Sequence, residues 1–127
     1  MQCINVIHGP TNTSINLTIK QLELSGLLTN IFTFFNNHTI KIEHVSEDSF
    51  KKCMEYLQYN VSNKYSDQWN VDFIDKILQD SYQLDKLYEL MIAADYMMIY
   101  GLVDLCAYKF SWIINHIEYK DVVSFHK

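Results

Sequence analysis

Hydrophobic and polar residues alternate in three short segments of the chain, which predicts three β-strands. These segments cover residues 3–8, 14–18 and 39–43. Residues 8–12, with the sequence His-Gly-Pro-Thr-Asn, are typical of a turn, so we expect the first two strands to form a hairpin.

In the rest of the chain, hydrophobic residues recur every three or four positions, which indicates amphipathic helices. Thr18, Ser25 and Ser46 stand where helix-capping residues are expected. Because the strands precede the helices without alternating with them, the pattern predicts an α+β fold, with a small three-stranded sheet packed against a helical cluster. The predicted helices cover residues 19–24, 25–35, 46–59, 69–78, 84–98 and 100–116, and another starts near residue 119.

The segment from Leu87 to Asp104 predicts two helices with a tight joint at residues 99–101. Paired alanines at 93 and 94 allow close packing of the first of these helices. Its predicted buried face consists of Leu84, Leu87, Tyr88, Met91, Ala94 and Met98.

Size and composition suit one globular domain, since the chain has 127 residues, 49% of them hydrophobic and 20% charged. A net charge of −5 without any arginine disfavours nucleic acids and anionic membrane surfaces as partners. The longest apolar run, residues 84–99, holds three carboxylates that each cost about 2.5–3.5 kcal/mol at a bilayer centre, so no membrane span is predicted. The first residues lack the pattern of a secretory signal, and the three cysteines are widely spaced. We therefore expect free, buried thiols and a cytoplasmic or nuclear location.

Residue types that carry chemistry do not cluster along the sequence. The five histidines are scattered, without the close Cys and His spacings of zinc sites. No nucleophile stands beside an orienting base, and no glycine-rich phosphate loop occurs. We therefore expect no metal, no cofactor and no enzymatic activity.

Three features, in chain order, together carry a resemblance that covers most of the sequence. They are a strand-turn-strand opening before Ser25, the pair of segments 40–45 and 50–57, and the series Trp69-x-x-x-Phe73, 87–97 and 101–105. This pattern resembles the Skp-type (S-phase-kinase-associated) adaptors of SCF ubiquitin ligases, which belong to the BTB/POZ fold superfamily. The resemblance implies one BTB/POZ-type domain over residues 1–127, with a core at 1–98 and shortened partner-binding helices at 99–127.

The function that the resemblance implies is non-catalytic. The protein would link the N-terminal domain of a cullin to an F-box or F-box-like substrate receptor in a cullin-RING ubiquitin ligase. The residues implied to bind the cullin are Asp95, Tyr96 and Met97. Those implied to bind the F-box partner are Leu102, Leu105, Phe110, Ile113, Ile114, Ile117, Val122 and Val123.

Some features depart from the family pattern and leave alternatives open. Asp95 stands where the family usually carries Asn, which predicts either weaker cullin binding or a different partner surface. The chain also stops at Lys127, soon after residues 119–123, whereas the family has two further C-terminal helices that clasp the F-box. One alternative is a BTB module that forms homodimers or titrates cullin without delivering substrate. A weaker alternative is an adaptor similar to elongin C, whose family pattern lacks the residue equivalent to Trp69.

Overall fold

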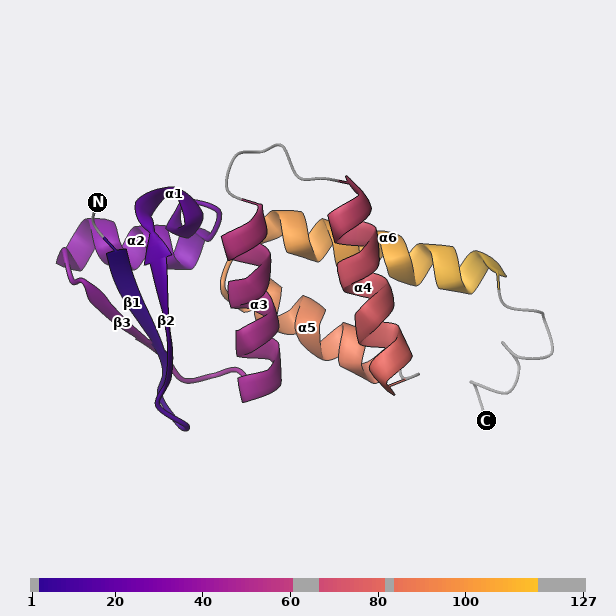
Figure 1. Cartoon of the computed structure of the whole chain (residues 1–127), viewed down its shortest axis with the longest axis horizontal. Helices are drawn as coiled ribbons and strands as arrows, with labels where there is room; N and C mark the ends of the chain where they lie inside the picture. Colours follow the sequence, from indigo (N-terminus) through magenta and orange to yellow (C-terminus); the bar gives the residue numbers. More distant parts are fainter. Residues whose placement is uncertain (1–2, 61–66, 82–83, 117–127) are drawn as a thin grey trace.

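The computed structural model describes residues 3–60, 67–81 and 84–116, and it confirms an α+β domain. The sheet and the first two helices lie at one end of it, and the other four helices lie at the other end (Figure 1). Within these residues there are three strands and six helices. In chain order they are β1 (Cys3–His8), β2 (Thr13–Thr18), α1 (Ile19–Leu22), α2 (Gly26–Phe35), β3 (Thr39–Ile42), α3 (Glu47–Tyr59), α4 (Asp67–Ser81), α5 (Leu84–Tyr96) and α6 (Tyr100–His116).

The sheet has the strand order β2-β1-β3, with β1 antiparallel to β2 and parallel to β3. The predicted hairpin and third strand are therefore confirmed. Val6, on the central strand, pairs with Ile15 on one side and Ile40 on the other. Because successive side chains of a strand point to opposite faces, the alternating sequence gives the sheet one buried apolar face. The fully or almost fully buried residues of this face are Ile4, Val6, Leu17, Ile40 and Ile42.

The predicted helix caps are confirmed. Thr18 and Gln21 form a reciprocal capping box at α1, and the hydroxyl of Ser46 accepts a hydrogen bond from the Ser49 amide at α3. Asn36 ends α2 in the left-handed conformation, with φ 50°. Helix α1 is two residues shorter than expected, since the chain turns at Leu22 to present Ser25 as the next cap.

Helix α5 lies at the centre of the helical cluster, where α3, α4 and α6 all contact it (Figure 1). The predicted orientation of this helix is partly wrong, because Tyr88 is 53% exposed while Leu90 and Ala93 are buried. Hydrophobic residues occupy nearly every position from 87 to 94. Their spacing therefore does not indicate which face of α5 is covered by α3, α4 and α6. The small Ala93 and Ala94 side chains do lie inside, as close packing requires.

The joint between α5 and α6 is held by the start of α2. Met98 adopts the left-handed conformation with φ 57°, so the chain turns at residues 97–99 rather than at 99–101. The Ser25 hydroxyl donates to the Met97 carbonyl at 2.6 Å and accepts from the Leu28 amide at 3.2 Å. The amide of Gly26 donates to the Met98 carbonyl at 3.0 Å. Groups at the start of α2 thus donate hydrogen bonds to the carbonyls that follow the end of α5.

Replacing Ser25 with alanine is expected to destabilise the fold by about 1–3 kcal/mol, because it removes both a helix cap and a buried hydrogen bond to the joint. The matched control is Ser46→Ala, which removes a cap at an exposed position. Urea unfolding of both variants measures the difference. Equal losses would show that the bond to Met97 adds nothing to stability.

Two of the three cysteines are buried, and all three are free thiols. Burial raises the pKa of Cys106 to about 12 and also raises the pKa of Cys53. Cys3 is exposed, which departs from the expectation that all three are buried. Because the thiolate is the reactive form, an aromatic disulfide reagent at about pH 8 should modify Cys3 alone in the native protein. Rapid reaction of all three thiols without denaturant would contradict this packing.

No helix in the described part of the chain combines the length and apolar character needed to cross a membrane.

Candidate functional site

The segment predicted to bind the cullin lies at the end of α5, and its three residues have different environments. Asp95 is exposed and Tyr96 is 41% exposed. Met97 is fully buried, because its carbonyl and side chain belong to the joint with α2. Its predicted role as a contact residue is therefore corrected to a core role in this conformation.

Tyr96 stands at one end of an open groove between α5 on one side and, on the other, the loop that joins β3 to α3 and the start of α3. We call this hollow of about 270 Å³ the α5 groove. Ile92 is 52% exposed on its α5 side, and the His44 ring meets the Tyr96 ring edge-on with 5.8 Å between centroids. The groove is lined by His44, Val45, Ser46, Ser49, Glu89, Ile92, Ala93 and Tyr96.

The loop side of the α5 groove is fixed by the N-terminal hairpin. His8 is almost fully buried and donates from Nε2 to the Val45 carbonyl at 2.7 Å, which leaves Nδ1 to accept from the Thr11 hydroxyl, also at 2.7 Å. The Thr13 hydroxyl donates to the Glu47 carboxylate at 2.5 Å. The hydrogen bonds from Thr13 and then Thr11 lower the pKa of Glu47. The turn of the hairpin therefore positions the groove wall before any partner binds.

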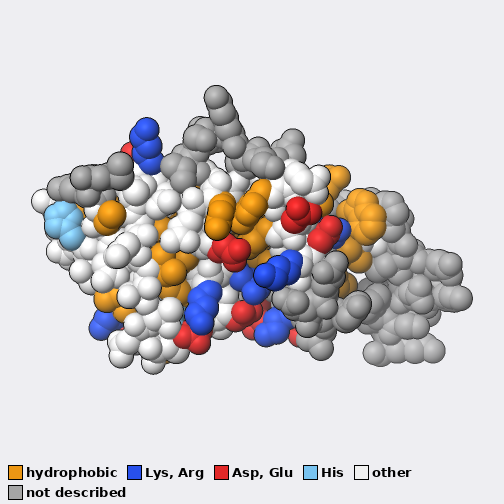
Figure 2. Space-filling model, in the orientation of Figure 1, with side chains coloured by type: hydrophobic (Ala, Val, Ile, Leu, Met, Phe, Trp, Pro, Cys, Tyr) orange, Lys and Arg blue, Asp and Glu red, His pale blue; other side chains and the backbone are white. Residues whose placement is uncertain are grey.

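Helix α6 exposes hydrophobic side chains on two sides. On the side toward α4 is a mostly apolar hollow of about 350 Å³, which we call the α6 groove. Exposed hydrophobic atoms are visible over the outer part of α6 (Figure 2). The groove is lined by Val71, Ile74, Asp75, Leu105, Tyr108, Lys109 and Trp112.

The charges of the α6 groove compensate each other. Lys109 Nζ lies 2.8 Å from the Asp75 carboxylate and 4.4 Å from the centroid of the Trp112 ring. Cation–π contact and ion pairing therefore hold this lysine across the groove.

The side of α6 toward α5 carries several of the residues predicted to bind the F-box. Phe110 and Ile113 are half-buried against the core, and Ile114 is 59% exposed. Tyr88 of α5 meets Phe110 edge-on, with 6.5 Å between ring centroids. Ile114 is two positions from Trp112, so the pitch of the helix sets them on roughly opposite sides. We call the side formed by Phe110, Ile113 and Ile114 the α6 outer side.

The other predicted F-box residues divide into three groups. Leu102 is fully buried in the hydrophobic core at the start of α6, so its predicted contact role is corrected to a core role. Leu105 is half-buried and lines the α6 groove. Three positions lie outside the described residues: Ile117, Val122 and Val123.

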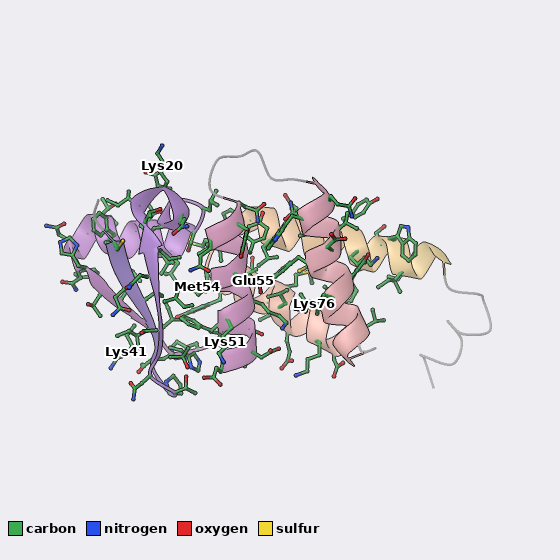
Figure 3. The ribbon with its side chains drawn as sticks, in the orientation of Figure 1. Lys20, Lys41, Lys51, Met54, Glu55 and Lys76 are labelled. Atoms are coloured by element: carbon green, nitrogen blue, oxygen red, sulfur yellow. The ribbon has the colours of Figure 1, made fainter. Side chains whose placement is uncertain are left out.

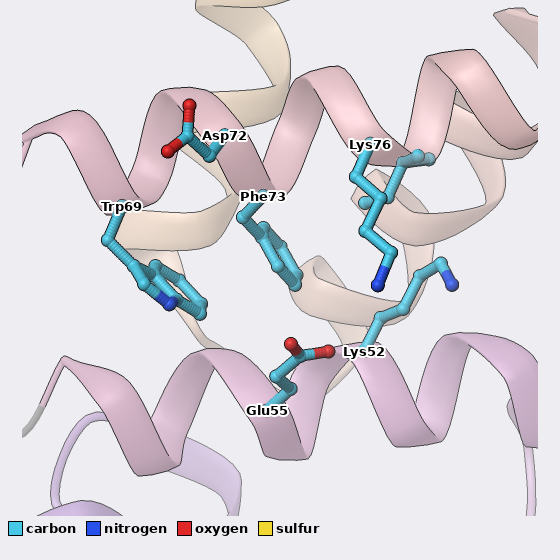
Figure 4. A pocket seen from close by; sticks show the side chains of 7 residues that line it. Lys52, Glu55, Trp69, Asp72, Phe73 and Lys76 are labelled. Atoms are coloured by element: carbon cyan, nitrogen blue, oxygen red, sulfur yellow. The ribbon is translucent and has the colours of Figure 1, made fainter.

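Trp69 and Phe73, which contributed to the resemblance, line a smaller pocket of about 190 Å³ between α3 and α4 (Figure 4). Their rings stack with centroids 4.9 Å apart, and Tyr59 stacks on the other face of Trp69 at 5.0 Å. Charged side chains line this pocket: Lys52 and Glu55 from α3, and Asp72 and Lys76 from α4, of which Glu55 and Lys76 are labelled in Figure 3. Since the rings bridge two helices, we assign Trp69 and Phe73 a structural role.

Sequence reasoning missed several residues of the grooves. His44 and Ile92 of the α5 groove are 48 positions apart, and Val71 and Tyr108 of the α6 groove come from different helices. One signal was available in the sequence. Ile92 is hydrophobic although it lies outside the predicted buried face of its helix, and an exposed hydrophobic residue can mark a binding surface.

Among the described residues, no group of three or more His, Cys, Asp or Glu side chains could hold a metal ion. The chain matches no known family model, and no curated protein sequence matches it.

Proposed function

We propose that the protein is a non-catalytic adaptor with a BTB/POZ-type fold, which joins a cullin scaffold to an F-box-type substrate receptor in the cytoplasm or nucleus. The observation that carries this proposal is the open α5 groove, since it ends at Tyr96, one of the residues to which the resemblance assigns cullin binding. Tyrosine is enriched among the residues that contribute most to protein–protein binding, and Tyr96 is partly exposed beside the exposed Ile92.

The separation of two apolar surfaces supports an adaptor rather than a single-partner module. The α5 groove is built by α5, the β3–α3 loop and the start of α3, whereas the α6 outer side is built by α6, with Tyr88 of α5 against Phe110. The two surfaces share no residue. In this proposal the cullin covers the α5 groove, and the F-box partner covers the α6 outer side.

Light scattering with size-exclusion chromatography tests the proposal. The full chain is measured alone, with a cullin N-terminal domain, with an F-box protein, and with both. We expect a monomer alone and a 1:1:1 complex with both partners. Failure to bind the cullin would refute the proposal, while cullin binding without F-box binding would indicate a cullin-titrating decoy.

A specific observation favours self-association as a second candidate function. Phe34 and Phe35 at the end of α2 are 79% and 68% exposed, and two neighbouring phenylalanines in water are a typical mark of an interface. They lie at the sheet end of the molecule, away from α6 (Figure 1). A dimer that becomes monomeric when both are replaced by serine would support this candidate. A monomer at all concentrations tested would exclude it.

A further inference from the structure

The exposed face of α5 has a ridge of half-exposed apolar and aromatic side chains. Tyr88, Ile92 and Tyr96 are 53%, 52% and 41% exposed and follow each other at intervals of four residues. Such i±4 rows are the ridges that pack into the grooves of a second helix in the commonest class of helix pairing. The shape of this surface therefore suits a helical partner.

Carboxylates flank this ridge on both sides. Glu89 and Asp95 stand three positions before and after Ile92, so each is a neighbour of Ile92 on the helix surface. Asp85 stands one turn before Glu89. Lys86 lies 3.6 Å from Glu89, but both side chains are about half exposed, so this ion pair is weak. The apolar ridge is thus bordered by three carboxylates, and among the described residues only Glu89 has an ion-pair partner.

The position of Asp95 is unfavourable for its own helix. It lies in the last turn of α5, where the helix dipole favours positive charge, and that turn contains no basic residue. None of the ion pairs within the described residues includes Asp95. Helix stability therefore does not account for a carboxylate at this position.

We propose that the partner of the α5 groove is a basic amphipathic helix, which sets apolar side chains on Ile92 and Tyr96 and a lysine or arginine against Asp95. Charge complementarity argues for this occupant, because a basic residue at that point would compensate both the helix end and the carboxylate. The inference rests on the proposed function, in which a cullin N-terminal domain supplies this helix. Asp95 then selects a partner with a basic residue, whereas an asparagine at this position would suit a partner with a neutral surface.

Calorimetric titration of the full chain with the cullin N-terminal domain tests the charge contribution. Binding of the unmodified chain should weaken when salt is raised from about 0.05 M to about 0.3 M. Asp95→Asn should weaken binding at least about threefold at low salt, and Asp95→Lys at least about tenfold. Asp104→Asn and Asp104→Lys on α6, also at an exposed aspartate, are the matched controls and should leave cullin binding unchanged.

A second readout separates recognition from stability. Asp95→Asn removes an unfavourable charge from the end of α5, so it should raise the midpoint of thermal unfolding while it weakens binding. A higher unfolding midpoint together with weaker binding would show that the carboxylate serves partner recognition at the expense of stability. If Asp95→Asn tightens cullin binding or leaves it unchanged, the basic partner is excluded.

The outcomes distinguish this inference from the proposed function. If Tyr96→Ala abolishes cullin binding while the Asp95 variants do not change it, the adaptor function stands and the basic partner is wrong. If the unmodified chain does not bind the cullin, the proposed function fails, and a leucine–lysine amphipathic peptide of about 18 residues replaces the cullin as probe. The inference is supported if Asp95→Lys abolishes peptide binding and Asp104→Lys preserves it. It is overturned if neither variant changes peptide binding, or if the peptide does not bind at all.

Discussion

Replacing Tyr96 with alanine is expected to weaken binding of the cullin N-terminal domain by at least about tenfold, a loss of about 2 kcal/mol or more. The ring stands at the end of the α5 groove and is 41% exposed, so it offers a partner a large apolar surface and a hydroxyl. Its contact with His44 holds the ring in place before binding, which keeps the entropic cost of docking low. Calorimetry measures the affinity, and circular dichroism verifies that the variant is folded.

Tyr108→Ala provides a matched control, because Tyr108 is also an exposed tyrosine on a helix but lines the α6 groove instead. Cullin affinity should remain unchanged in this variant. A Tyr96→Ala protein that is folded and binds the cullin as tightly as the unmodified chain would disprove the assignment of the α5 groove.

Replacing Ile114 with aspartate is expected to abolish F-box binding, with a loss of roughly 2–5 kcal/mol. Ile114 is 59% exposed in the free protein and adjoins Ile113 and Phe110 on the α6 outer side. A partner that covers this side would bury an unpaired carboxylate, whose desolvation nothing compensates. Because Ile114 is exposed before binding, the fold itself should tolerate the change. Co-purification with an F-box protein and titration of the purified complex give the affinity.

The reciprocal variant is Ile92→Asp, since Ile92 is an isoleucine of similar exposure in the α5 groove. It should abolish cullin binding and preserve F-box binding, whereas Ile114→Asp should do the reverse. Loss of both partners in either variant would mean that the two surfaces act as one. Trp112→Ala then shows which side of α6 the F-box partner uses, because Trp112 belongs to the α6 groove.

The strands, the turn and the helix caps could be predicted from the sequence because each depends on neighbouring residues. Alternation fixes which face of β3 is buried, and a serine hydroxyl just before a helix accepts a hydrogen bond from an amide of the first turn, as that of Ser46 does from Ser49. Asn36 ends α2 for an equally local reason, since its short polar side chain tolerates the left-handed conformation.

The parts that sequence reasoning misplaced depend on contacts between distant segments. Which side of α5 is buried depends on α3, α4 and α6 together, so the local pattern put Tyr88 inside and left Leu90 out. Met97 and Leu102 were predicted at interfaces, yet both are fully buried in the core. The α5 groove was partly predicted through Tyr96, but its opposite wall needed His44, which only the folded chain brings near.

The bond between Ser25 and the carbonyl of Met97 joins residues that are 72 positions apart. Closing so long a loop is entropically costly and tends to slow folding, so we expect the joint to form late. During synthesis, α2 leaves the ribosome well before residues 97 and 98 exist to receive its amides. The end of α5 that carries Tyr96 would then mature only when most of the domain has been translated. A nascent or partly unfolded chain would lack a finished α5 groove, so partner capture would report that folding is complete.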